Sequence, residues 1–153
     1  MNGKSITLGE NIFLSQKNRE IANILSCNKF TEKKGLTLTE SQAAGIAVVR
    51  ENSLKETGRV EFGGGVSEKL IAAFYDSPYI DGDNYADILC ELTEIFYSYK
   101  DETQDALSDD AIIVYMKNAF NGRCGGSTEL LKEDELSSLV KSLNAKGGAG
   151  YLL

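Results

Sequence analysis

Apolar residues recur every three or four positions between Asp83 and Lys100, and this is the period of an α-helix. The stripe is formed by Tyr85, Ile88, Leu89, Leu92, Ile95, Phe96 and Tyr99. Side chains at this spacing share one face of a helix. Asp83 or Asn84 can cap its first turn, because a short polar side chain accepts a hydrogen bond from a free backbone N–H group. We therefore predict a central helix whose apolar face the rest of the chain covers.

The same spacing recurs in five other segments and predicts helices near residues 15–27, 40–57, 66–75, 108–121 and 134–144. Ser15 can cap the first of them. A capping box precedes the second, in the pairing Thr37 with Glu40 or Thr39 with Gln42.

The remaining segments are less regular. Residues 59–62 alternate between polar and apolar side chains and fit a short strand. Residues 5–14 fit a strand, a lead-in or a first helical turn. Gly45 lies inside a predicted helix, where the lack of a side chain would let another helix approach closely.

These elements and their short connectors predict an all-α, single-domain bundle of about six helices, with one or two very short strands at most. The single domain spans residues 1–153, with a lead-in of undecided structure at 1–14 and a glycine-rich tail at 145–153.

Composition narrows the class of protein. The chain has 153 residues, of which 42% are apolar and 25% charged, as in a soluble globular domain. It has no apolar run near the roughly 18 residues that cross a bilayer, and its first residues do not read as a signal peptide. We expect a cytoplasmic protein without membrane contact. Its three cysteines include no C-x-x-C pair, so neither a disulfide framework nor a zinc site is expected.

The chain contains no histidine. This excludes Ser-His and Cys-His nucleophile pairs and nearly all transition-metal sites. We therefore predict no catalytic residue, no metal site and no cofactor.

Charge is concentrated in the middle of the chain, which has a net charge of −7. Residues 76–110 hold eleven acids and one base, Lys100. An acidic segment of this kind argues against binding of nucleic acid or of an anionic membrane. It fits a solvated helix face with acidic helix starts, a docking face for a basic partner, or a cation site.

A run of three glycines precedes the predicted helix at 66–75 and forms a candidate anion site. Backbone N–H groups at a helix start attract anions, and nearby arginines would add positive charge. The phosphate-loop and dinucleotide-binding patterns are absent, and three glycines at a tight turn are more often a packing or hinge device than a ligand site. The candidate ligand-binding residues are Arg59, Glu61, Gly63, Gly64, Gly65 and Arg123.

Tyrosine is more frequent than one small core needs for apolar volume. Its large, rather rigid side chain with a polar tip is favoured at protein interfaces. We select Tyr79, Tyr97 and Tyr115 as candidate interface residues, with core packing as the alternative.

The runs SLKETGRVEFGGGVSEKLIAAFYDSPYI (53–80), DNYADILCELTEIFYSYKDE (83–102) and AFNGRCGGS (119–127) resemble an uncharacterised family of small clostridial proteins, a domain of unknown function. The resemblance covers roughly residues 21–143 and implies no activity, substrate or ligand. It implies one whole domain in a cytoplasmic, anaerobic setting. It also marks 58–65 and 121–126 as a candidate shared surface.

Two functions remain open on the sequence. The first is a non-enzymatic protein-interaction or regulatory module with a protein partner or a second copy of itself. The second is a small-anion or phosphate-ligand site, or an enzyme, built on the glycine run. The second requires the guanidinium groups of Arg59 and Arg123 to converge on that run beside a real pocket.

Overall fold

The computed structural model describes residues 8–61 and 65–145, and it confirms the predicted all-α fold. Within these residues six helices are nine residues or longer, and there is no strand. They are α1 (Leu8–Ser26), α3 (Glu40–Glu56), α4 (Val66–Phe74), α5 (Tyr85–Glu102), α6 (Asp109–Asn121) and α8 (Leu136–Ala145). The shorter pieces are α2 (Asn28–Thr31), a 3₁₀ turn (Glu32–Lys34), α7 (Thr128–Leu130) and a π-helical turn (Leu131–Glu135).

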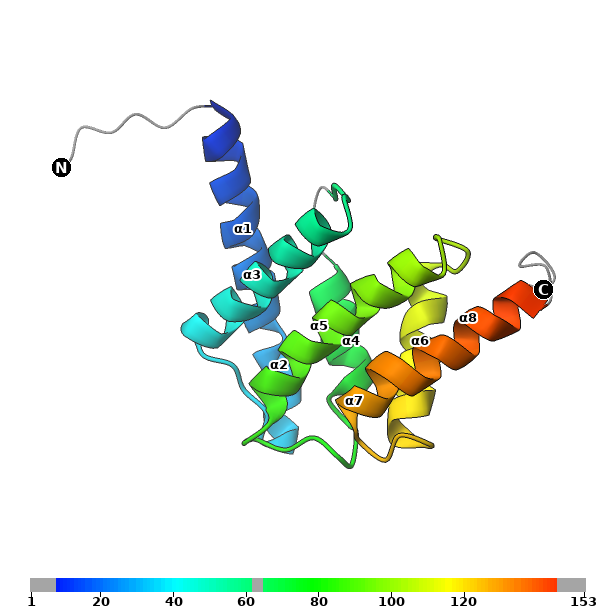
Figure 1. Ribbon diagram of the computed structural model, residues 1–153. Helices are drawn as coiled ribbons and strands as arrows, with labels where there is room; N and C mark the ends of the chain where they lie inside the picture. The colour runs from blue at the N-terminus through cyan, green and yellow to red at the C-terminus, as the bar shows by residue number, and fades with distance from the viewer. Residues whose placement is uncertain (1–7, 62–64, 146–153) are drawn as a thin grey trace.

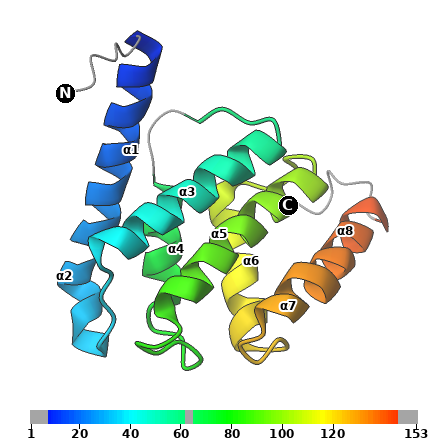
Figure 2. The ribbon, with the colours of Figure 1, turned by 60° about the vertical axis from the view of Figure 1, so that its left-hand side comes forward.

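Helix α5 is the central helix that the apolar stripe predicted. It contacts α3, α4, α6, α7 and α8. Figures 1 and 2 show it between α3 on one side and the α7–α8 segment on the other. Every residue of the predicted stripe is at most 8% exposed. The fold is thus organised around this helix, as expected from the sequence.

The start of α3 confirms one of the two capping boxes left open by the sequence. The Thr39 hydroxyl accepts a hydrogen bond from the Gln42 backbone N–H at 3.1 Å, and the Gln42 side chain accepts one from the Thr39 N–H at 2.9 Å. At α6 the Ser108 hydroxyl likewise accepts from the Ala111 N–H at 3.1 Å.

The predicted side-chain cap of α5 is wrong. Asn84 stands at the N-cap position, but its side chain turns back into the preceding loop. There it accepts from the Asp81 N–H at 2.8 Å and donates to the Tyr79 carbonyl oxygen at 3.1 Å. The Asn84 side chain is thus oriented toward the loop and makes no capping hydrogen bond to the first turn of α5.

Helix α1 begins earlier than the sequence indicated. It starts at Leu8 and runs through Ser15, so Ser15 is not a cap. Figures 1 and 2 show its first turns extending beyond the rest of the molecule. The other expectations near residues 59–62 and at Gly45 also fail: residues 59–61 form no strand, and a Cβ built on Gly45 would meet nothing within 4 Å. Phe62, residues 1–7 and the tail at 146–153 lie outside the described residues.

None of the helices within residues 8–61 and 65–145 has the length and apolar character needed to cross a membrane.

Candidate functional site

Arg59 is held by two acids, one in the last turn of α5 and one in the loop that follows it. Its Nη1 donates to Asp105 Oδ1 at 2.7 Å, and its Nη2 lies 3.8 Å from Asp101 Oδ1. Of the predicted glycine run, Gly63 and Gly64 lie outside the described residues. Gly65 occupies the N-cap position of α4 with φ +106°, a backbone conformation that side chains rarely adopt. Gly65 therefore has a structural reason to be glycine.

Arg123 forms a fork with a different acid. Its Nη2 donates to Glu135 Oε1 at 2.7 Å and its Nε to Glu135 Oε2 at 3.0 Å. The Tyr115 hydroxyl donates to Glu135 Oε1 at 3.1 Å. The Arg123 hydrogen bonds, together with that of Tyr115, hold the pKa of Glu135 below its usual value. Each guanidinium that the anion-site hypothesis requires is thus engaged by its own carboxylates.

Glu61, another of the predicted ligand-binding residues, belongs to a buried polar cluster around Arg50. Arg50 Nη2 donates to Glu61 Oε1 at 2.9 Å, and its Nη1 donates to Glu20 Oε1 at 3.2 Å. Its Nε donates to the Tyr97 hydroxyl at 3.2 Å, which itself donates to Glu61 Oε1 at 2.8 Å. The Ser67 hydroxyl donates to Glu20 Oε2 at 3.3 Å. This cluster ties α1, α3, α4 and α5 together.

Burial sets the direction of the pKa shift at two members of this cluster, Glu20 and Tyr97. It raises the pKa of Glu20 even though Arg50 acts in the opposite direction. It also raises the pKa of the Tyr97 hydroxyl. A cavity of about 70 Å³ lies beside Glu20, Arg50 and Glu61, enough for a water molecule or two. The geometry is that of a structural polar core.

The three candidate interface tyrosines have different surroundings. Tyr97 is fully buried, and Tyr115 is half-buried with its hydroxyl on Glu135. Tyr79 is 42% exposed, and its ring covers Gly126, where an added Cβ would lie 2.5 Å from Tyr79 Cγ. The surface therefore presents one of the three, Tyr79, to a partner.

The three cysteines are free thiols, two of them buried and Cys90 half-buried. Burial raises the pKa of the Cys27, Cys90 and Cys124 thiols. The nucleophilic thiolate form is therefore disfavoured at neutral pH.

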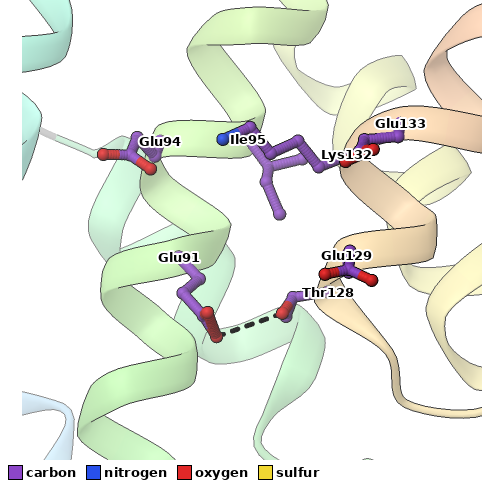
Figure 3. Close-up of a pocket in the computed structure, with 7 residues that line it drawn as sticks. All are labelled: Glu91, Glu94, Ile95, Thr128, Glu129, Lys132 and Glu133. Carbon is purple, nitrogen blue, oxygen red and sulfur yellow. Dashed lines mark hydrogen bonds between the residues drawn. The ribbon is translucent and has the colours of Figure 1, made fainter.

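Two hollows between α5 and the α7–α8 segment were not predicted from the sequence. The first has a volume of about 320 Å³ and is lined by Glu91, Glu94, Ile95, Thr128, Glu129, Lys132 and Glu133 (Figure 3). The second has a volume of about 410 Å³ and is lined by Lys132 and Glu133 together with Glu102, Leu136, Ser137, Val140 and Lys141. Because Lys132 and Glu133 line both, the two hollows adjoin, and we call them together the acidic groove.

The carboxylates of the acidic groove are exposed. Within the described residues, no lysine or arginine nitrogen lies within 4.0 Å of Glu91, Glu94, Glu129 or Glu133. Glu91 accepts one neutral hydrogen bond, from the Thr128 hydroxyl at 3.1 Å across the groove. These acids therefore differ from Glu20, Glu61 and Glu135, whose charges are matched inside the fold.

The π-helical turn forms part of one wall of this groove. It is fixed from beneath by the Tyr99 hydroxyl, which donates to the Leu131 carbonyl oxygen at 2.6 Å, and by the Arg123–Glu135 pair. Lys132 and Glu133 lie on its exposed side. π-helical turns are rare and are often found at functional sites. Within the described residues, no group of three or more acids, cysteines or histidines is placed to hold a metal ion.

Comparison with known proteins gives a family for the chain. A family model described as a family of unknown function (DUF6323) matches residues 23–148. The chain belongs to this family. Nothing among the curated proteins or the solved structures matches it. The resemblance seen in the sequence is thus confirmed at the level of an uncharacterised DUF6323 family, which brings no activity with it.

Proposed function

We propose that this DUF6323 protein is a non-enzymatic interaction module that binds a protein partner through the acidic groove. The observation that carries the proposal is the set of four exposed, unpaired glutamates on two facing walls of one hollow. Like charges held close together repel one another and cost stability. A fold that keeps them beside a hollow gains attraction for a basic partner.

The alternative of a small-anion or phosphate-ligand site has less support. An anion would have to displace Asp105 from Arg59 and Glu135 from Arg123. Charge-assisted hydrogen bonds of this length are among the stronger contacts in proteins. The interaction module also accords with the lack of histidine and with the buried thiols. Its cytoplasmic location and the clostridial setting implied by the resemblance stay predictions.

A photo-reactive amino acid tests the proposed function. Benzoylphenylalanine replaces Glu133 in the groove or, as the matched control, Val114, which is 57% exposed on α6. In extract of the source cells we expect a cross-linked protein from position 133 and none from position 114. Equal adducts from both positions, or none from either, would argue against a binding module of this kind.

A further inference from the structure

The acidic groove has the length of a short helix. Helix α5 and the α7–α8 segment run side by side in both views of the ribbon (Figures 1 and 2). On α5 the lining residues extend from Glu91 to Glu102. At 1.5 Å per residue this distance is about 16 Å, or three helical turns. A helix of three turns laid along the groove would therefore contact its whole length.

The groove offers two kinds of contact. The walls carry carboxylates on both sides, such as Glu91 on α5 and Glu129 on α7. The apolar groups lie lower, with Val140 half-buried and Leu136 9% exposed. A helix with a narrow apolar stripe flanked by positive charges matches both at once, in the way that amphipathic helices bind grooves in other proteins.

Lys132 stands where the two hollows meet. Figure 3 shows its side chain extended from the α7 side across the groove, with the ammonium nitrogen, the one blue atom drawn, beside α5. Lys141 also lines the second hollow. Lys132 thus supplies the first hollow with a cation from its own wall, and within the described residues this cation forms no ion pair with a groove carboxylate. Exposed lysine side chains change rotamer within nanoseconds, so this cation can move aside.

We propose that the acidic groove binds an amphipathic helix of a partner protein that carries lysine or arginine beside an apolar stripe, and that Lys132 is the internal competitor which this helix displaces. The inference rests on the proposed function and specifies its partner. The cation of the partner takes the place of the Lys132 ammonium in the groove, and the apolar stripe covers Val140 and the exposed edge of Leu136.

The test uses the full chain and a fluorescent synthetic peptide of about 14 residues, with leucines at helical spacing and lysines on either side. A scrambled peptide of the same composition is the control. We expect the ordered peptide to bind and the scrambled one to bind at least about tenfold more weakly, as measured by fluorescence anisotropy at physiological salt. Equal binding of both would mean that only net charge is recognised and would overturn the proposal.

Two double variants locate the binding. E91Q/E129Q removes one charge from each wall, and glutamine can still accept the Thr128 hydrogen bond. E32Q/E56Q removes two exposed charges outside the groove and has the same net charge. We expect the groove variant to weaken peptide binding about tenfold and the control less than about twofold. Equal weakening by both variants would contradict a site in the groove.

Single variants test the competitor. K132A should tighten peptide binding at least about threefold, whereas K33A, which removes an exposed lysine outside the groove, should change it by less than about 1.5-fold. Equal changes in peptide affinity for K132A and K33A would show that Lys132 does not compete with the peptide. Light scattering without peptide adds one outcome: a dimer that E91Q/E129Q dissociates would identify a second copy of the chain as the occupant and would overturn the proposal. Failure of the peptide together with a cross-link from position 133 would reject this partner and leave the interaction module standing.

Discussion

At the scale of single residues, three buried tyrosines of α5 differ in what their hydroxyl groups do. The Tyr97 and Tyr99 hydroxyls donate to Glu61 and to the Leu131 carbonyl oxygen. The Tyr85 hydroxyl is buried and has no hydrogen-bond partner among the described residues. Burial raises the pKa of Tyr85 to about 12. A buried polar group without a partner lowers stability.

Removing the hydroxyl should therefore have opposite effects at two of these positions. Y85F should leave the free energy of unfolding unchanged or raise it by up to about 1 kcal/mol, since an unsatisfied group is lost. Y99F should lower it by about 1–2 kcal/mol, since the Leu131 carbonyl oxygen loses its partner. Urea denaturation of the two matched variants checks this. A larger loss for Y85F than for Y99F would contradict it.

The acids that pair with Arg59 and Arg123 could not be predicted from the sequence. The sequence placed Arg59 and Arg123 beside glycine-rich connectors, but nothing in their spacing indicated which acids they would meet. Asp105 is 46 residues from Arg59, and Glu135 is 12 residues from Arg123. Arg50 lies within a predicted helix among polar neighbours and gave no signal that it would be buried. Pairing over such distances depends on the packing of whole helices.

At the scale of elements, the connector after α6 is held by one ion pair. Gly126 supports the Tyr79 ring, and the Arg123 fork ties the connector to Glu135 at the end of the π-helical turn. The wall of the acidic groove that carries Lys132 and Glu133 therefore depends on the protonation state of Glu135.

This dependence predicts how acid acts on the fold. The lowered pKa of Glu135 means that its contribution to stability is fully present above the value of the unfolded chain, about 4.3, and is lost as pH falls through the lower folded value. E135Q should be less stable than the native protein at neutral pH, and the difference should shrink below about pH 4.3.

The matched control is E133Q, on the same turn, which removes an exposed acid without an ion pair among the described residues. Its difference from the native protein should not shrink in that acidic range. Urea denaturation at a series of pH values measures both variants. A pH-independent difference for E135Q would show that the pair with Arg123 does not stabilise the turn.

The helices were the part of the fold that the sequence predicted well, because each buries an apolar stripe with helical spacing. The stripe of α5 and one of the two proposed capping boxes, Thr39 with Gln42, were correct. Errors arose where a side chain had a choice of partners. Asn84 is a residue type that often caps helices, but its side chain forms hydrogen bonds within its own loop. The path by which the chain reaches α5 decides between these partners, and the sequence pattern does not show that path.

At the scale of the whole molecule, two populations of acids are present that the sequence cannot separate. One is matched by Arg50, Arg59 and Arg123 inside the fold, and the other lines the acidic groove without ion pairs. The sequence showed the excess charge of residues 76–110 but not that Glu129 and Glu133, from a separate segment, would face it. The groove exists only once α7 and α8 lie beside α5.

Unpaired charge of one sign should make the folded state sensitive to salt. With a net charge of −7, the compact chain repels itself, and screening by added ions relieves this repulsion. We expect the melting temperature to rise by about 2–4 °C between about 10 mM and about 300 mM sodium chloride, which corresponds to roughly 1 kcal/mol for a chain of this size. E91Q/E129Q should show a smaller rise than E32Q/E56Q, because the groove concentrates charge that the other surfaces disperse. Calorimetry at matched pH measures the melting temperatures of the native protein and the two double variants. A melting temperature of the native protein that falls with salt would contradict the prediction. It would mean that the internal ion pairs, rather than the groove acids, govern the electrostatics of the fold.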